Sequence, residues 1–177
     1  PFLVIAAVDS AGDPWATLVE ARAGLAQSAD ARHLQINALP GQGDPAGDAL
    51  MPGDGIGVLG IELQTRRRNR VNGRVVARDD RQLTLQVEHA FGNCPQYIQA
   101  REFRFSGDPA EPFVGRTDVL AKLDAEAIAM IGAADTFFVA SYVDPEGDAG
   151  RRQVDASHRG GKAGFVRIDG DVLTIPD

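Results

Sequence analysis

The residues best suited to chemistry lie between positions 155 and 165. A hydroxyl, an imidazole, a guanidinium and an ammonium group occur close together there, on Ser157, His158, Arg159 and Lys162. Glycines lie among them, and a glycine has no side chain to keep a ligand away from the backbone. Charged donors make the strongest hydrogen bonds to anions. The stretch therefore predicts a site for a phosphate or another anion, with a solvated basic hairpin loop as the alternative.

A second group of polar side chains occupies positions 66–78. Six arginines fall within it: Arg66, Arg67, Arg68, Arg70, Arg74 and Arg78. The valines of this stretch favour a strand, in which successive side chains point to opposite faces. Arg68 and Asn72 should then share a face with Arg66, Arg70 and Arg74. We expect this face to meet either an anionic partner or water.

Three segments resemble one known family in their order and spacing. They are Ser157-His158-Arg159-Gly160-Gly161 with Gly164-Phe165-Val166 and Leu173–Asp177, then Thr65–Arg74, then Phe91–Gln99. They are similar to the bacterial two-module branch of the proteins related to pyridoxamine 5′-phosphate oxidase. The resemblance covers most of the chain after residue 65, and it rests on all three segments together.

The resemblance implies a fold and a function. The fold is a mainly β, antiparallel, Greek-key-like FMN-binding split barrel with a short linking helix. The function is that of an FMN-dependent oxidoreductase, a homodimer that binds the flavin between subunits and acts on a small-molecule substrate that the resemblance does not identify. By position, the cofactor-binding residues would be Ser157, His158, Arg159, Gly161, Lys162 and Phe165, joined by Arg68 and Asn72. No catalytic side chain is implied, because the flavin carries the redox chemistry.

The sequence departs from the family in one place. The family continues past the strand at 172–176 into further phosphate-binding segments, whereas this sequence stops at Asp177. The resemblance makes FMN the expected cofactor. Because the further phosphate-binding segments are missing from this sequence, whether FMN is bound stays open, as does the choice between FMN, a deazaflavin and haem. Two other functions remain as alternatives: a non-catalytic flavin- or haem-binding protein, and a cofactor-free structural or interaction protein. Whether Pro1 and Asp177 are natural ends is also left open.

The composition excludes several classes of protein. With 177 residues, 44% hydrophobic and 24% charged, the chain reads as an ordinary globular protein without an apolar run that could span a membrane. A net charge of −7 argues against nucleic-acid binding. The one cysteine, Cys94, cannot form an intrachain disulfide, which suits a cytoplasmic protein. Nothing nearby in sequence would lower the pKa of its thiol, so we expect a buried structural cysteine, with a redox thiol as the alternative. The histidines, His33, His89 and His158, are too far apart in sequence to predict a metal site.

Short strands with turn signals between them dominate the pattern of hydrophobic residues. We expect strands near 2–8, 15–20, 33–38, 56–63, 66–78, 83–88 and 102–105, with a loop at 40–55 and a tight bend at 91–99. Glycines 57 and 60 predict the close approach of another backbone or a ligand. A helix should begin after an N-cap at Asp124 and end near Gly132.

The chain also repeats itself. Residues 2–13 and 137–148 match at an offset of 135, with the same residue at Phe2/Phe137, Val4/Val139, Val8/Val143, Asp9/Asp144, Gly12/Gly147 and Asp13/Asp148. The repeat predicts a duplication, against the alternative that any hairpin looks alike. We therefore expect a first split-barrel module at 1–106, a linker and helix at 107–135, and an incomplete second module at 136–177. The last of these is too short to form a core of its own, so it should pack on the first module or on another chain.

Overall fold

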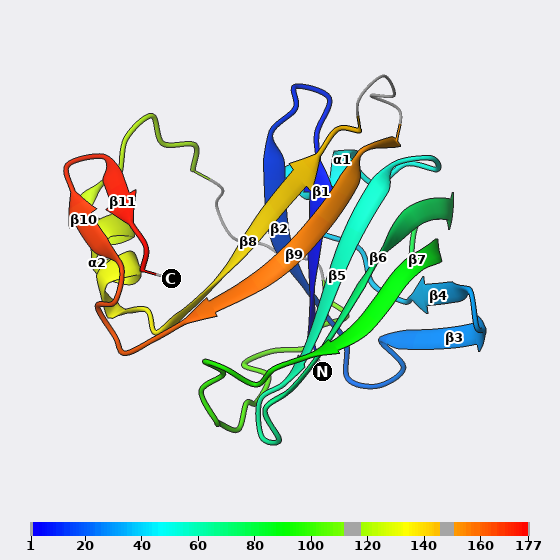
Figure 1. Ribbon diagram of the computed structural model, residues 1–177, viewed down its shortest axis with the longest axis horizontal. Coiled ribbons are helices and arrows are strands. Elements are labelled where there is room, and N and C mark those ends of the chain that lie inside the picture. Colours follow the sequence, from blue (N-terminus) through cyan, green and yellow to red (C-terminus); the bar gives the residue numbers. More distant parts are fainter. Residues whose placement is uncertain (1, 112–117, 146–150, 177) are drawn as a thin grey trace.

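The computed structural model describes residues 2–111, 118–145 and 151–176 (Figure 1). Its strands are β1 (Phe2–Val8), β2 (Pro14–Glu20), β3 (Ala26–Asp30), β4 (His33–Ile36), β5 (Gly55–Glu62), β6 (Arg67–Arg78), β7 (Leu83–Asn93), β8 (Thr136–Val143), β9 (Gln153–Gly160), β10 (Arg167–Asp169) and β11 (Val172–Thr174). The helices are α1 (Pro45–Asp48) and α2 (Ala125–Ala133). The predicted mainly β, antiparallel fold is confirmed. None of the described helices has the length and apolar content to cross a membrane.

Seven strands form one antiparallel sheet in the order β2-β1-β5-β6-β7-β4-β3. Val19 of β2 and Ile36 of β4 belong to the same buried cluster, although their strands lie near opposite ends of this order. The sheet must therefore be rolled around its core, and α1 adds Ala46 to the same cluster. The roll is open, because β2 and β3 are not hydrogen-bonded to each other within the described residues.

The hairpin of β8 and β9 lies across the outer face of the sheet (Figure 1). Val154 and Ala156 of β9 are buried in a second core with Val4 and Ala6 of β1 and Leu59 of β5. Strand β1 is thus covered on both faces, which explains why its sequence is a continuous apolar run. Of the described strands in the predicted second module, β8 and β9 pack on the first module and β10 and β11 do not, while the division into modules itself stays a prediction.

Two glycines of β5 let the β8–β9 hairpin approach closely. A Cβ atom on Gly57 would lie 2.8 Å from the backbone of Asp155 and Ala156, and one on Gly55 would lie 2.4 Å from the carbonyl oxygen of Arg152. Neither position could carry a side chain with β9 in place. The close approach predicted at Gly57 is therefore made by the backbone of β9.

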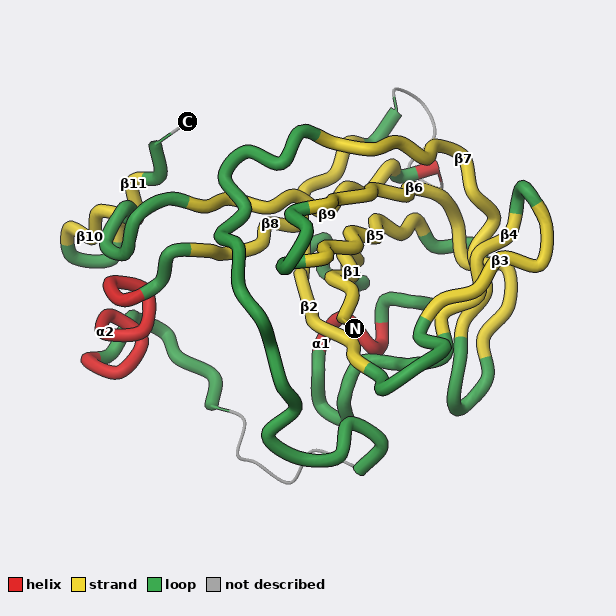
Figure 2. The backbone as a smooth tube through the Cα atoms, turned by 90° about the horizontal axis from the view of Figure 1, so that it is seen from below, coloured by secondary structure: helices red, strands yellow, loops and turns green. Residues whose placement is uncertain are grey.

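A small lobe made of α2, β10 and β11 stands apart from the sheet (Figures 1 and 2). Helix α2 begins as predicted, with the carboxylate of Asp124 accepting a hydrogen bond from the backbone N–H of Ala127 at 2.8 Å. All nine residues of α2 stay at least partly exposed in the described structure, including Met130 at 69%. The lobe therefore has no core comparable to that of the sheet.

The two copies of the repeat both form hairpins. β1 begins at Phe2 and ends at Val8, and β8 covers the matching residues 137–143 before the chain returns in β9. Gly147 and Asp148 of the second copy lie outside the described residues, as do Pro1, Asp177 and residues 112–117 of the predicted linker.

Several predicted boundaries were wrong. Strand β7 continues through Phe91 to Asn93, because pairing with Arg70 and Arg68 of β6 overrides the turn signals of the predicted bend. Strand β3 was not predicted, since its alanines and polar residues are all exposed and only pairing with β4 holds them extended. Residues 102–105 form no strand, and the predicted loop at 40–55 contains α1.

Candidate anion-binding site

An ion pair joins β6 to the β8–β9 hairpin. The guanidinium of Arg70 donates to the Asp155 carboxylate, with 2.8 Å between Nη1 and Oδ2. The other oxygen of Asp155 accepts a hydrogen bond from Nδ2 of Asn72 at 3.1 Å. Arg70 and Asn72 share a face of β6, as the alternation of the strand predicts. The anionic partner expected for this face is thus supplied by the same chain.

Arg68 lies on the same face and contacts His158 of β9. Its Nη1 is 3.4 Å from Nδ1 of the imidazole, and its Nη2 donates to the carbonyl oxygen of Cys94 at 2.8 Å. A guanidinium can only donate hydrogen bonds, so Nδ1 is the acceptor. A neutral ring then carries its proton on Nε2. Arg66, which was expected on this face, precedes β6 in a left-handed turn with a φ of 54°.

Three nitrogen atoms at this contact lack a hydrogen-bond partner within the described part of the chain. They are Nε of Arg68, Nε of Arg70 and Nε2 of His158, and all three are buried. The Oδ1 atom of Asn72 is likewise unpartnered there. Because buried polar groups nearly always have partners, these three donors are the atoms that an acceptor such as water or an oxyanion would satisfy. We call Arg68, Arg70, Asn72, Asp155 and His158 the β6–β9 cluster.

The cluster carries excess positive charge. Burial, together with the charges of Arg70 and Arg159, lowers the pKa of Arg68 below its usual value. The pKa of His158 is lowered to about 4, first because the residue is buried, with only 7% of it exposed, and then because Arg68 lies beside it. The imidazole is therefore neutral at pH 7, and Asp155 offsets one of the two guanidinium charges. The remaining charge favours an anion.

The other predicted site residues lie outside these contacts. Ser157 is half-buried, while Arg159 and Lys162 are exposed, and the described structure records no hydrogen bond from any of the three side chains. Phe165 stacks on Phe137 with 5.6 Å between ring centroids. Of the predicted set, the structure brings His158 and Arg68 into contact, and Asn72, on the same face of β6, contacts Asp155.

Gly161 serves packing, whereas the sequence suggested an opening for a ligand. A Cβ atom there would lie 2.8 Å from Cγ of Phe165, so the aromatic ring fills that space. The backbone N–H of Gly161 donates to the carbonyl oxygen of Asp135 at 2.9 Å, and its own carbonyl accepts from Gln99 at 2.9 Å. This glycine anchors the loop after β9.

Sequence reasoning gave Asp155 no role, and it also expected a buried Cys94. Asp155 stands at the start of the glycine-rich stretch, but nothing local shows that its partners are Arg70 and Asn72 more than 80 residues earlier. Cys94 is exposed, since it follows the last residue of β7 in a turn outside both cores.

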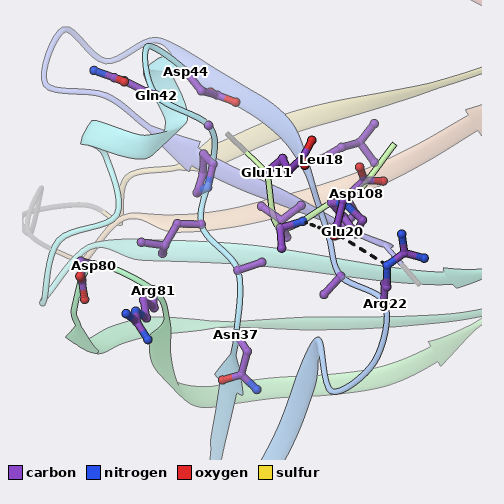
Figure 3. Close-up of a pocket in the computed structure, with 18 of the residues that line it drawn as sticks. Leu18, Glu20, Arg22, Asn37, Gln42, Asp44, Asp80, Arg81, Asp108 and Glu111 are labelled. Carbon is purple, nitrogen blue, oxygen red and sulfur yellow. Dashed lines mark hydrogen bonds and ion pairs between the residues drawn. The ribbon is translucent and has the colours of Figure 1, made fainter. Parts of the chain in front are cut away.

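A cavity of about 1530 Å³ opens elsewhere, along β2, the loop 37–45 and residues 108–111 (Figure 3). None of the predicted site residues lines it. Its charged lining comprises Glu20, Arg22, Asp44, Asp80, Arg81, Asp108 and Glu111. Among the described residues of this lining, carboxylates outnumber guanidiniums, which disfavours an anionic ligand there. No group of three His, Cys, Asp or Glu side chains that could hold a metal occurs among the described residues.

No protein-family model and no curated protein matches this sequence. Two solved structures of HupZ from Group A Streptococcus are similar in part, one of them a histidine-to-alanine variant. The variant is 14% identical, and the match covers 52% of this chain and 89% of that chain with a TM-score of 0.40. The other structure is 13% identical, and the match covers 57% of this chain and 90% of that chain, also with a TM-score of 0.40. The likeness is confined to about half of this chain.

Proposed function

We propose that this protein binds FMN through its phosphate at the β6–β9 cluster, and that it is an FMN-dependent oxidoreductase that acts as a homodimer on a small-molecule substrate. One observation carries the proposal. Two strands that are distant in sequence bring Arg68, Arg70 and His158 together, with three buried donor atoms unpartnered in the described structure. Donors and excess positive charge in one place are what a phosphate needs.

The residues present fit a phosphate group. Arg68 and His158 would hold it with the donors left over from their contacts within the chain, and Arg159 would add charge from the next position of β9. The redox chemistry would be supplied by the isoalloxazine ring, while the protein supplies position and electrostatics. Partial burial of the cluster strengthens the attraction by lowering the local dielectric.

The position of the proton on the neutral His158 ring favours a phosphate over a haem iron. A haem ligand offers iron a nitrogen lone pair, and in this ring Nδ1 accepts from Arg68 at 3.4 Å. The other nitrogen, Nε2, then bears the proton and is a donor. A donor suits an oxyanion and does not suit a metal centre.

A second candidate is a cofactor-free interaction protein, and one observation favours it. Asp155 already engages Arg70 and Asn72, so part of the cluster serves to fasten the hairpin to the sheet. In that case the unpartnered donors would be met by water.

The test is a titration of the purified chain with FMN, followed by flavin absorbance and fluorescence, with riboflavin as the ligand that lacks the phosphate. We expect saturable binding of FMN that Arg68→Ala weakens about tenfold or more, because a hydrogen bond to a charged group is lost. Riboflavin binding should change much less.

The matched control is Arg32→Ala, which removes an exposed arginine at the turn between β3 and β4. This variant should bind FMN as the parent chain does. If the parent chain binds no flavin, the oxidoreductase proposal fails and the interaction protein is favoured.

A further inference from the structure

We propose that Asp155 makes this site selective for a single phosphate group over a diphosphate. The inference rests on the proposed function, because it concerns which anion the β6–β9 cluster accepts. It adds a role for a residue that binds no part of the ligand itself and instead occupies one donor of Arg70 and one of Asn72.

The first step is the geometry of the carboxylate. Its two oxygens are held separately, Oδ2 by Nη1 of Arg70 at 2.8 Å and Oδ1 by Nδ2 of Asn72 at 3.1 Å. A guanidinium and an amide holding two oxygens of one anion are the contacts that a phosphate would make in the same place. Asp155 is thus an internal anion in one half of the cluster.

The second step is which donors this leaves without a partner. Arg68, Arg70 and Asn72 follow one another at every second position of β6, so their side chains are spaced by roughly 7 Å along one face. With Asp155 on Arg70 and Asn72, the donors without a partner in the described chain are Nε of Arg68, Nε of Arg70 and Nε2 of His158. One phosphate can use this end of the row.

The third step is the effect on a larger anion. A second phosphate on the same ligand would extend along the row toward Arg70 and Asn72, where it meets the Asp155 carboxylate. Like charges this close repel, and an unfavourable contact with the wrong ligand is an effective source of specificity. A phosphate monoester such as FMN avoids this contact, whereas a diphosphate ester does not.

The experiment compares inorganic phosphate with pyrophosphate by calorimetry, at one pH and one ionic strength, on the full chain. The test variant is Asp155→Asn, which keeps the size of the side chain and an oxygen for Arg70 but removes the charge. We expect its affinity for pyrophosphate, taken relative to phosphate, to rise about tenfold or more, as expected for removing a nearby like charge. Asp169→Asn, at an exposed position of β10, is the control and should leave the ratio unchanged.

Thermal unfolding checks that each variant is folded. Asp155→Ser is a second neutral variant, and it gives the same comparison if the asparagine does not fold. If FMN binds the parent chain while neither neutral variant raises the ratio, the role of Asp155 is wrong and the proposed function stands. If the parent chain binds neither FMN nor phosphate, both proposals fail.

Discussion

The two hairpins of the repeat have similar sequences and different surroundings. β1 pairs with β2 on one side and β5 on the other, and five of its seven residues are buried. β8 pairs with β9 alone among the described strands, and its residues are half-buried or exposed. The first hairpin therefore builds the sheet, and the second lies on top of it.

This difference shows that the repeat determines local structure and that tertiary contacts determine burial. An apolar run followed by an Asp-containing turn gives a hairpin in both places. Only β1 lies between two cores, one inside the rolled sheet and one beneath the β8–β9 hairpin. Substitutions at matching positions of β1 and β8 should therefore lower the free energy of unfolding by different amounts.

The largest effect should come from inserting a side chain between the β8–β9 hairpin and the sheet. Gly57→Ala places a Cβ atom 2.8 Å from the backbone of Asp155 and Ala156, where no flexible side chain can move aside. We expect the free energy of unfolding to fall by about 3 kcal/mol or more, the upper end for overpacking. Urea unfolding measures this loss.

The control is Gly60→Ala on the same strand, where the nearest atom is Cδ2 of the Leu3 side chain at 3.3 Å. Leu3 can adjust, so the loss should be much smaller. Equal losses at the two glycines would mean that the hairpin does not rest on Gly57.

Acid should weaken the contact between β9 and the sheet through His158. Its pKa is about 4 in the folded protein, against a usual value of 6.5, because burial and Arg68 disfavour the charged ring while Asp135 partly opposes them. The unfolded chain thus binds more protons between these values. The contribution of His158 is complete above pH 6.5 and is lost as the pH falls toward 4, by at most about 3 kcal/mol.

Chemical unfolding of the parent chain and of His158→Gln at several pH values between 7 and 4 measures how the free energy of unfolding depends on pH. The substitution should weaken this dependence, whereas His89→Gln, at an exposed histidine of β7, should not. A parent and a His158→Gln curve that stay parallel over this range would contradict the proposed burial of a neutral ring.

The smallest effect should come from matching valines of the repeat. Val4 is 1% exposed in β1, and its counterpart Val139 in β8 is only half-buried. Val4→Ala should cost about 2 kcal/mol, from two buried methyl groups and the cavity they leave, and Val139→Ala under about 1 kcal/mol. Thermal unfolding of both variants compares them, and equal costs would show that burial is not what separates the hairpins.

Much of the fold could be predicted from the sequence, because local patterns carry it. The apolar run of β1 and the N-cap at Asp124 are local signals, and the even-numbered polar face of β6 follows from alternation alone. Gly57 also marked the approach of another backbone. The strand β3 and the end of β7 escaped prediction, since partner strands hold them extended against weak or opposing local signals.

The sequence by itself determined which residues could bind an anion: basic and polar side chains gathered in two short stretches. Only the tertiary structure decided which of them meet. In the folded protein His158 contacts Arg68, and Asp155 accepts hydrogen bonds from Arg70 and Asn72. The ring of Phe165 fills the space at Gly161. The physical reason is that contacts between β6 and β9 join residues more than 80 positions apart, and their register is set by the packing of apolar side chains in the core below.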